Sequence, residues 1–425
     1  MSSTFEIISS HRWLRSPTIL DNNRVIAWLN RFGVDDQPRA GLLLSTVKLV
    51  SADEFVADMN DLLERHLGDG ATPIALYNET ERGHRGGVPH RLFAEPRRKL
   101  KRATGKAGPA LVPRQRQVDE EVGSEGTLAT ILTQFARSHA KTIVLSPGPD
   151  TIRDRRVRRF VLVTDFIGSG DRALRYLTAA WRVRSVRSWW SRRKGRGMSF
   201  EVVAFSGTEA GVAHVRKHPC RPEVHIAQVC PTIDGVFDAP NAAIMKTLCG
   251  DYGPKAKDAQ PLGYGGTGAL IAFSHSMPNN APAIFWQRYD DKEPLFPSRV
   301  TSGVASPFQA GIGDEAQHNR LIKLVGLGSA EAMVPFRIES VILAALERSP
   351  RSTEGISGRL GVALSEVEEA LKILRSRGLI DRRNVPTDRG RRALVRIKGE
   401  PPSPFLSKPK EGEYFPDSLR VPRGV

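Results

Sequence analysis

The sequence predicts an α/β protein built on a parallel sheet, with helices before the sheet and a small helical module after it. Buried-strand segments alternate with helical segments through the middle of the chain, which is typical of a covered parallel sheet with right-handed crossovers. The chain has 425 residues, enough for more than one domain. After residue 335 the pattern changes to three closely spaced helical segments.

Residues 1–70 form a predicted N-terminal helical extension. Apolar residues at helical spacing from Val25 to Phe32 predict one helix, with Asp21 as its cap. Ser51 and Glu54 form a capping box for another. These helices carry no residue pattern that suggests chemistry.

Residues 71–330 contain the predicted sheet domain. A helix is expected from Asp171 to about Trp189, and residues 96–117 are so rich in basic residues, Pro and Gly that they predict an exposed loop or disordered insertion. The expected strands span 73–77, 143–145, 160–163, 200–205 and 224–229.

Residues 335–398 predict a winged helix-turn-helix domain. Ser352 and Ser365 are expected to cap its second and third helices. Residues 379–380 and 395–397 are expected to pair as strands around an Arg-rich hairpin, the wing. Residues 399–425 are a Pro-rich tail that is expected to be extended.

The net charge of +17, from 63 basic against 46 acidic residues, favours polyanionic partners such as nucleic acid or phosphorylated ligands. Three cysteines without a CxxC pair predict no disulfide framework, and no segment has the length and apolarity of a membrane span. We therefore expect a cytoplasmic protein without a membrane partner.

The segment with the clearest chemistry is 161–172, in which a predicted strand ends near Asp165 and a Gly168-Ser169-Gly170 turn opens a helix. Ligands of parallel α/β sheets bind beyond the carboxyl ends of the strands. Successive N–H groups in such a turn, with the Ser169 hydroxyl and the helix dipole, suit one phosphate. Asp165 is placed to hold ribose hydroxyls or a metal-bound water, and Asp171 is expected to be the helix N-cap.

This segment resembles the phosphoribosyl-pyrophosphate motif of type I phosphoribosyltransferases. More closely, the chain resembles the PRTase-CE group, divergent phosphoribosyltransferase-like proteins of bacterial conflict and antiphage loci, including retron-associated ones. The supporting stretches are 165–170, Leu262-Gly263-Tyr264-Gly265-Gly266-Thr267-Gly268, Phe273-Ser274-His275 and Pro278-Asn279-Asn280. The resemblance implies a type I phosphoribosyltransferase-like domain joined to the winged helix.

The resemblance also implies a ligand and a set of site residues. The ligand would be phosphoribosyl pyrophosphate or a nucleotide-like molecule, with Mg²⁺ if the domain is catalytic. Asp165 would be the catalytic carboxylate, and the first acidic position of the family motif is Thr164, which leaves both an active transferase and an inactive binding domain open. The expected phosphate-binding residues are Thr164, Gly168, Ser169, Gly170, Arg85, Gly86 and Gly87, of which the last three are equally consistent with a flexible Gly-Arg surface loop.

Two further clusters carry expectations. Arginines are interleaved with tryptophans from Arg172 to Arg196, which suits either a single-stranded nucleic acid or a solvated helix packed through its tryptophans. The spacing of His218, Cys220, His225 and Cys230 matches no usual zinc pattern, so we expect no metal there. The expected nucleic-acid contacts are Arg192, Arg193, Arg382, Arg383, Arg389, Arg391 and Arg392.

Three functions follow as hypotheses. The first is a bacterial defence protein that binds a phosphoribosyl or nucleotide ligand together with a nucleic-acid or protein partner, such as a reverse transcriptase and its noncoding RNA. The second is a ligand-sensing transcriptional regulator with an inactive pocket, which Glu366, Glu368 and Glu369 at the start of the reading helix disfavour. The third is a scaffold that holds a partner through its Arg- and Trp-rich helix.

Overall fold

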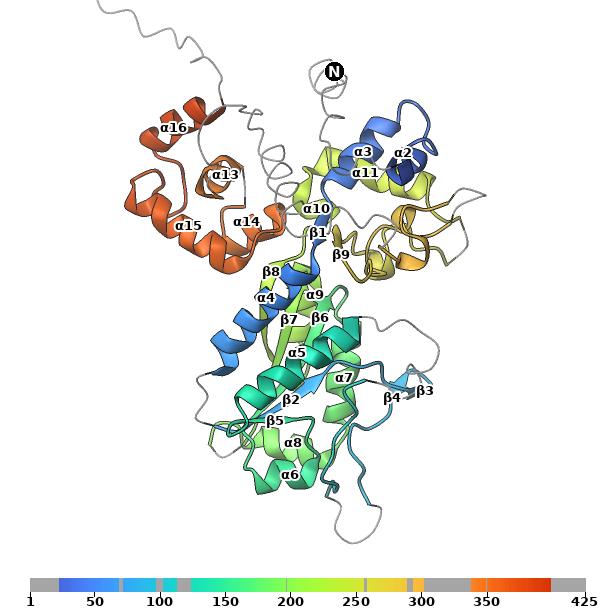
Figure 1. Cartoon of the computed structure of the whole chain (residues 1–425), viewed down its shortest axis with the longest axis vertical. Helices are drawn as coiled ribbons and strands as arrows, with labels where there is room; N and C mark the ends of the chain where they lie inside the picture. The colour runs from blue at the N-terminus through green and yellow to red at the C-terminus, as the bar shows by residue number, and fades with distance from the viewer. Residues whose placement is uncertain are drawn as a thin grey trace, which may run out of the picture.

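The computed structural model describes residues 23–68, 72–96, 102–112, 124–195, 197–255, 258–288, 293–301, 338–348 and 350–398. They form a central sheet domain, a smaller unit beside the carboxyl ends of its strands, and a C-terminal helical module (Figure 1). Parts of the predicted basic loop and the whole tail from residue 399 lie outside the described residues.

The central sheet has five parallel strands in the order β5-β2-β6-β7-β8, which confirms the predicted parallel sheet. They are β2 (Ile74–Asn78), β5 (Ile143–Leu145), β6 (Arg159–Ile167), β7 (Ser199–Gly207) and β8 (Glu223–Val229). The chain leaves β2 toward the edge strand β5 and then returns past β2 to form β6. Loops after β2 and β6 therefore diverge, which makes this pair the topological switch point where open α/β sheets bind ligands.

Helices cover both faces of the sheet, which explains why its strands are apolar almost throughout. One face packs against α4 (Ala52–Leu63) and α5 (Ser124–Ser138), and the other against α6 (Pro149–Asp154), α7 (Asp171–Trp181), α8 (Arg184–Ser191) and α9 (Glu209–Arg216). The predicted Ser51 cap is confirmed, because its side chain accepts the N–H of Glu54 at 3.1 Å.

The smaller unit lies over the carboxyl ends of the strands (Figure 1). Its apolar core includes Trp28, which stacks on Phe285 at 5.5 Å, so segments far apart in sequence fold together. Its elements are α2 (Asn23–Leu29), α3 (Gln37–Ser45), α10 (Ile233–Val236), α11 (Ala239–Asp251) and the parallel pair β1 (Lys48–Val50) and β9 (Ile271–Phe273). The unit places residues 262–285 above the switch point.

Short elements complete the described chain: η2 (Glu64–Gly68), β3 (His84–Arg85), β4 (Val88–Pro89), η4 (Tyr264–Gly266), η5 (Ala283–Phe285) and η6 (Pro297–Arg299). No described helix has both the length and the apolar character needed to cross a membrane.

The C-terminal module contains the three predicted helices and a fourth: α13 (Ile338–Ala345), α14 (Thr353–Leu360), α15 (Leu364–Ser376) and α16 (Asp388–Lys398). Ser352 caps α14 as predicted. The predicted cap at Ser365 is wrong, because the N-cap of α15 is Ala363, two residues earlier.

The predicted wing strand at 395–397 is also wrong. These residues are part of α16, whose first turn is capped by the Thr387 side chain, which accepts the N–H of Gly390 at 3.1 Å. Leu394 is buried and Ile397, three residues on, packs beside it, whereas Val395 is 38% exposed. The spacing of the buried residues is therefore that of a helix. The wing is reduced to a turn closed by one β-bridge between Ile380 and Pro386.

The predicted helix from Asp171 to Trp189 is two helices. The chain breaks at Val183, which has an extended conformation and caps α8. Strand β6 is longer than predicted and runs to Ile167. Thr164 and Asp165 therefore lie within the C-terminal half of the strand rather than after it.

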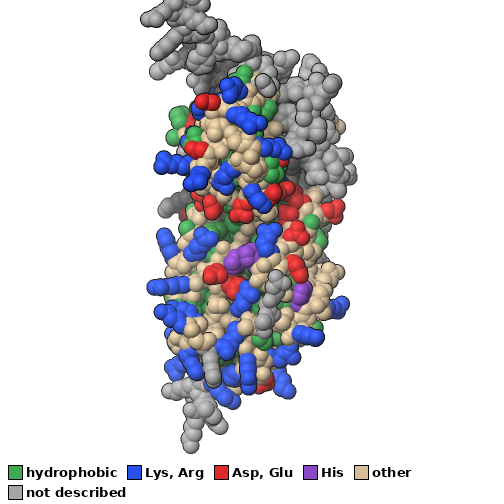
Figure 2. Space-filling model, turned by 90° about the vertical axis from the view of Figure 1, so that its left-hand side faces the viewer, with side chains coloured by type: hydrophobic (Ala, Val, Ile, Leu, Met, Phe, Trp, Pro, Cys, Tyr) green, Lys and Arg blue, Asp and Glu red, His purple; other side chains and the backbone are tan. Residues whose placement is uncertain are grey.

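The C-terminal module docks on the edge strand β8. The Ser357 side chain of α14 is fully buried and accepts the N–H of Val229, the last residue of β8, at 3.0 Å. Gly358 lies against the Val229 side chain, since a β-carbon built on Gly358 would be 3.0 Å from Cγ1 of Val229. Acidic side chains gather in a band between the module and the sheet domain (Figure 2).

Candidate functional site

The loop 168–170 lies where the sequence predicts it, between the end of β6 and the start of α7. Gly170 is the N-cap of α7 and has a left-handed conformation (φ +88°), which favours glycine. The predicted Asp171 cap is therefore wrong by one residue, since Asp171 is the first residue of the helix. The Ser169 hydroxyl accepts the N–H of Asp171 at 3.3 Å.

Asp165 lies beside this loop at the switch point. Its Oδ1 accepts the N–H of Phe166 at 2.8 Å, and its Oδ2 is 4.0 Å from Nε2 of His275. Burial lowers the pKa of His275, although Asp165 opposes that shift, and no described group hydrogen-bonds its Nε2. His275 was not among the predicted site residues, because only the return of the chain after β9 brings it to Asp165.

Glu79 is a second carboxylate at the switch point that sequence reasoning missed. It follows β2, its side chain is 3% exposed, and its Oε2 accepts the Thr164 hydroxyl at 2.9 Å. Burial raises the pKa of Glu79; Arg172 opposes the shift and the nearby negative charge of Asp165 adds to it. Two acidic groups from neighbouring strands therefore face each other across Thr164.

Arg172, in the first turn of α7, balances this negative charge. Its Nε donates to Oε1 of Glu79 and a terminal nitrogen donates to Oε1 of Glu125, each at 3.2 Å. The carboxylate of Glu79, and then Asp165 and Glu125, raise the pKa of Arg172 against the effect of burial. The carboxylates of Glu79, Glu125 and Asp165 thus surround the guanidinium of Arg172. This group lies next to the loop 168–170, whose backbone amides suit an anion.

Residues of the smaller unit cover the loop. A β-carbon on Gly168 would lie 2.1 Å from the side chain of Asn280, so only glycine permits this approach. Asn280 donates to the carbonyl of Tyr264 at 2.9 Å, and the Tyr264 hydroxyl accepts a hydrogen bond from Arg175 at 3.3 Å. These contacts place Asn280 and Tyr264 beside the loop.

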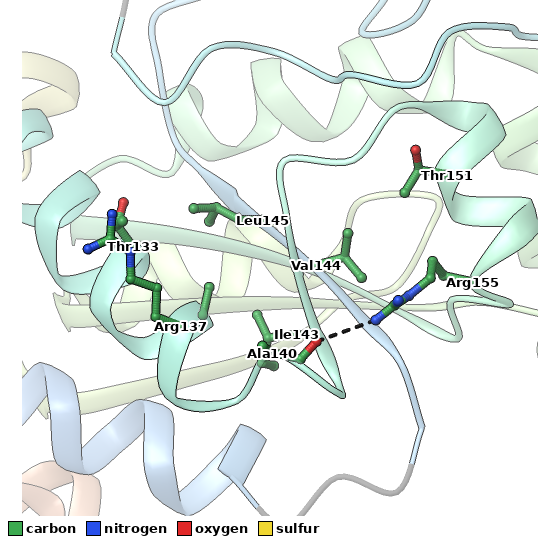
Figure 3. Close-up of a pocket in the computed structure, with 9 residues that line it drawn as sticks. Thr133, Arg137, Ala140, Ile143, Val144, Leu145, Thr151 and Arg155 are labelled. Atoms are coloured by element: carbon green, nitrogen blue, oxygen red, sulfur yellow. Dashed lines mark hydrogen bonds between the residues drawn. The ribbon is translucent and has the colours of Figure 1, made fainter.

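The two described surface depressions lie elsewhere. The larger, about 460 Å³, lies beside the edge strand β5, where Arg155, the C-cap of α6, donates to the Ala140 carbonyl near Arg137 of α5 (Figure 3). The other, about 250 Å³, lies between α3 and α11. Neither depression is lined by residues of the loop 168–170.

The predicted phosphate-binding residues Arg85, Gly86 and Gly87 lie apart from this loop. They form the exposed hairpin between β3 and β4. The strand after them is held by Arg182, near the far end of α7, which donates to the Pro89 carbonyl. Within the described chain, no hydrogen bond or ion pair joins the hairpin to residues 168–170.

The predicted nucleic-acid residues form two separate surfaces. Arg192 and Arg193 are exposed and directly follow α8, a helix at the end of the sheet domain away from the C-terminal module (Figure 1). The other five, Arg382, Arg383, Arg389, Arg391 and Arg392, are exposed on the reduced wing and on α16. Basic side chains also dominate the lower part of the face in Figure 2.

The tryptophans of this region are largely structural. Trp181, Trp189 and Trp190 pack against the sheet core, and the Trp190 indole donates to the Cys220 carbonyl at 2.7 Å. The guanidinium of Arg193 lies 3.6 Å from the Trp190 ring centroid. This surface therefore presents arginine charge to a partner, while its tryptophan rings already pack against the protein core and Arg193.

Two of the His and Cys residues considered for zinc, His218 and Cys220, are buried and in contact with each other. Burial raises the pKa of Cys220 to about 12, and the Sγ of Cys220 contacts Nδ1 of His218. Oxygen and nitrogen atoms of Glu201, Glu223 and His225 do lie close together. However, both oxygens of Glu201 accept hydrogen bonds from Arg159, at 2.7 and 2.6 Å, so an ion-pair network accounts for this group.

The fold and the loop define a phosphoribosyltransferase-like α/β domain with a winged-helix module. The family model PRTase-CE matches residues 25–298, and the model wHTH-PRTase associated matches residues 340–421. The chain therefore belongs to the PRTase-CE family and carries its associated winged helix, as the sequence resemblance predicts. Comparison with curated proteins and with solved structures gave no match.

Proposed function

We propose that this protein binds phosphoribosyl pyrophosphate, or a related 5-phosphorylated ribose, at the loop 168–170. The observation that carries the proposal is the position of this loop and Asp165 at the switch point between β2 and β6, where such sheets bind ligands. In this proposal the Ser169 hydroxyl and the amides at the start of α7 bind the 5-phosphate.

A Mg²⁺ ion that accompanies the ligand would take oxygen ligands from the two carboxylates at the switch point, Asp165 and Glu79. When bound, Mg²⁺ would neutralise charge on the pyrophosphate of such a donor. Asp165 would hold the ribose and Arg172 would attract the negatively charged ligand. In a transfer reaction a nitrogen nucleophile would attack C1 of the ribose as pyrophosphate leaves, so the protein would act mainly by positioning and electrostatics.

Isothermal titration of the full chain with phosphoribosyl pyrophosphate and MgCl₂ tests this proposal. We expect Asp165→Ala and Ser169→Ala to weaken binding at least tenfold. Arg85→Ala in the exposed hairpin tests the predicted second phosphate contact independently. Binding that none of these substitutions alters would place the ligand elsewhere. Release of pyrophosphate with candidate acceptors, measured in parallel, distinguishes a transferase from a binding domain.

We further propose that the protein acts in bacterial defence with a nucleic-acid partner, as the resemblance to conflict-system proteins implies. The charge of +17 and the two exposed arginine surfaces support a polyanionic partner. Co-purification of nucleic acid from the host, and loss of phage protection in an Asp165→Ala strain, are the expected results. Replacing Arg389, Arg391 and Arg392 with Ala should reduce the salt dependence of nucleic-acid binding.

A ligand-sensing role for the winged helix is the second candidate, and one set of contacts favours it. The first turn of α9 touches both the loop and the C-terminal module: Thr208 donates to the Gly168 carbonyl, and Glu209 lies beside Gly358. Movement of the loop on ligand binding would thus reach α14. A DNA footprint that changes with phosphoribosyl pyrophosphate would support this role, and an unchanged one would oppose it.

A further inference from the structure

The carboxylate of Glu79, directly after strand β2, lies beside Thr164, where the motif lacks an acid. The parallel register pairs Asn78 with Val163, and the N–H of Glu79 donates to the Val163 carbonyl at 2.8 Å. Glu79 therefore lies opposite Thr164, whose hydroxyl donates to its Oε2 at 2.9 Å. The strand pairing, rather than the local sequence, brings a second acid to Asp165.

From this arrangement we propose that Glu79 is a specificity-determining residue. It accepts a hydrogen bond from one hydroxyl of the ribose 2,3-diol, and Asp165 accepts a hydrogen bond from the other hydroxyl. This inference rests on the proposed function and names the feature of the ligand that the site selects. Vicinal hydroxyls are two adjacent donors, and two carboxylates from neighbouring strands are matching acceptors.

The burial of Glu79 supports a role beyond packing. A carboxylate that is 3% exposed is costly unless its lone pairs are satisfied. The Thr164 hydroxyl and the Nε of Arg172 each donate one hydrogen bond to it, and two carboxylate oxygens offer more acceptor sites than that. The nearby charge of Asp165 adds to that cost, and a diol that donates to both acids would offset it.

Thr164 is a positioning residue in this arrangement. Its hydroxyl lies 2.9 Å from Glu79 and 3.3 Å from Oδ1 of Asp165, and it is 2% exposed. It therefore holds the two carboxylates at a fixed separation without contacting the ligand. A carboxylate placed at position 164 itself would point toward the same space, because the backbone of β6 is unchanged.

The rival explanation is that Glu79 only orients Arg172. Glu125 provides a matched control for this explanation, because it also accepts a hydrogen bond from Arg172 at 3.2 Å. That bond comes from a terminal nitrogen of the guanidinium, whereas Glu79 is bonded by Nε. If Glu79 acts through Arg172 alone, Glu125→Gln and Glu79→Gln should have similar effects on ligand selectivity. If Glu79 binds the diol, only Glu79→Gln should alter selectivity for hydroxyls.

The experiment compares two probes in MgCl₂ by titration calorimetry of the full chain. They are ribose 5-phosphate and tetrahydrofurfuryl phosphate, which has a similar ring and phosphate without hydroxyls. We expect the unmodified protein to prefer ribose 5-phosphate by about tenfold or more, and Glu79→Gln to lose most of that preference while binding the second probe equally well. Glu125→Gln should keep the preference.

The double variant Glu79→Gln with Thr164→Glu returns a carboxylate to the site from β6 and should restore the preference for ribose 5-phosphate. If Glu79→Gln does not fold, Thr164→Val gives a second readout, because it removes the hydroxyl that donates to Glu79 and should also lower the preference. If Glu79→Gln keeps the full preference, or Glu125→Gln loses it equally, the inference is overturned and the proposed ligand site stands. If the unmodified protein binds neither probe nor phosphoribosyl pyrophosphate, the proposed function itself fails.

Discussion

The Thr208 hydroxyl donates to the carbonyl of Gly168 at 2.6 Å and so joins the loop after β6 to the first turn of α9. The same oxygen accepts the N–H of Gly211 at 2.9 Å, which makes Thr208 the N-cap of α9. One side chain thus fixes both the candidate phosphate loop and the helix that contacts the C-terminal module.

Replacement of Thr208 by Val should weaken both folding and ligand binding. The variant loses the cap and leaves the Gly168 carbonyl without this donor, which should cost about 1–2 kcal/mol of stability. The affinity for phosphoribosyl pyrophosphate should fall severalfold because the loop is less ordered. Thr232→Val is the control, since Thr232 caps α10 in the same way. If Thr208→Val and Thr232→Val bind phosphoribosyl pyrophosphate with equal affinity, the loop 168–170 is not part of the ligand site.

Replacement of Asn280 by Ala should strengthen ligand binding. The side chain of Asn280 lies against Gly168, and we expect a ligand at the loop to displace it. An equilibrium that favours this position of Asn280 reduces apparent affinity by the fraction of molecules in which the side chain has moved away. We expect a gain of about two- to tenfold in affinity for phosphoribosyl pyrophosphate by calorimetry, with the exposed Asn60→Ala as control. Weaker binding in Asn280→Ala would mean that the amide contacts the ligand itself.

Much of this fold follows from sequence patterns, and the parts that do not follow depend on long-range pairing. Apolar runs and caps such as Ser51 and Ser352 act within a few residues, so the pattern alone locates their elements. The loop 168–170 was predicted for the same reason. Glu79 was missed because it is 85 residues from Thr164, and only the pairing of β2 with β6 brings the two together.

The wing was predicted wrongly for a local reason. Val395 and Ile397 alternate as in a strand, but the Thr387 cap and the burial of Leu394 select a helix. Asn280 and His275 were within segments that supported the family resemblance, yet their approach to the loop depends on how the smaller unit folds over the sheet. Their contacts therefore could not be derived from spacing in the chain.

Replacement of Ser357 by Ala should loosen the C-terminal module from the sheet. The Ser357 oxygen accepts the N–H of Val229 at 3.0 Å and donates to the Val362 carbonyl at 2.7 Å, both in buried surroundings. Leaving two buried backbone groups unpaired should cost about 2–3 kcal/mol. Faster hydrogen exchange at Val229 is the expected signal. Ser376→Ala, which removes an exposed hydroxyl of the same module, should leave that exchange rate unchanged.

Asp58 of α4 should make stability depend on pH. Burial, with contributions from Glu54 and from Glu366 of α15, raises the pKa of Asp58 from 3.8 to about 6, although Lys48 opposes the shift. Because the folded state binds the proton more tightly, Asp58 favours folding most below pH 3.8. That contribution is lost as pH rises to about 6 and stays lost above it.

Asp58→Asn should therefore stabilise the protein by about 1–3 kcal/mol at pH 7, because a neutral amide replaces a partly buried charge. It should also flatten the pH dependence of the unfolding free energy between pH 4 and 6, measured by urea denaturation at each pH. Asp53→Asn, an exposed position on the same helix, is the control. Since Glu366 contributes to the shift, Glu366→Gln should reproduce part of the effect only while the C-terminal module remains docked on the sheet domain. An effect of Glu366→Gln that vanishes in the Ser357→Ala background would locate the acidic contact at the interface between the module and the sheet domain.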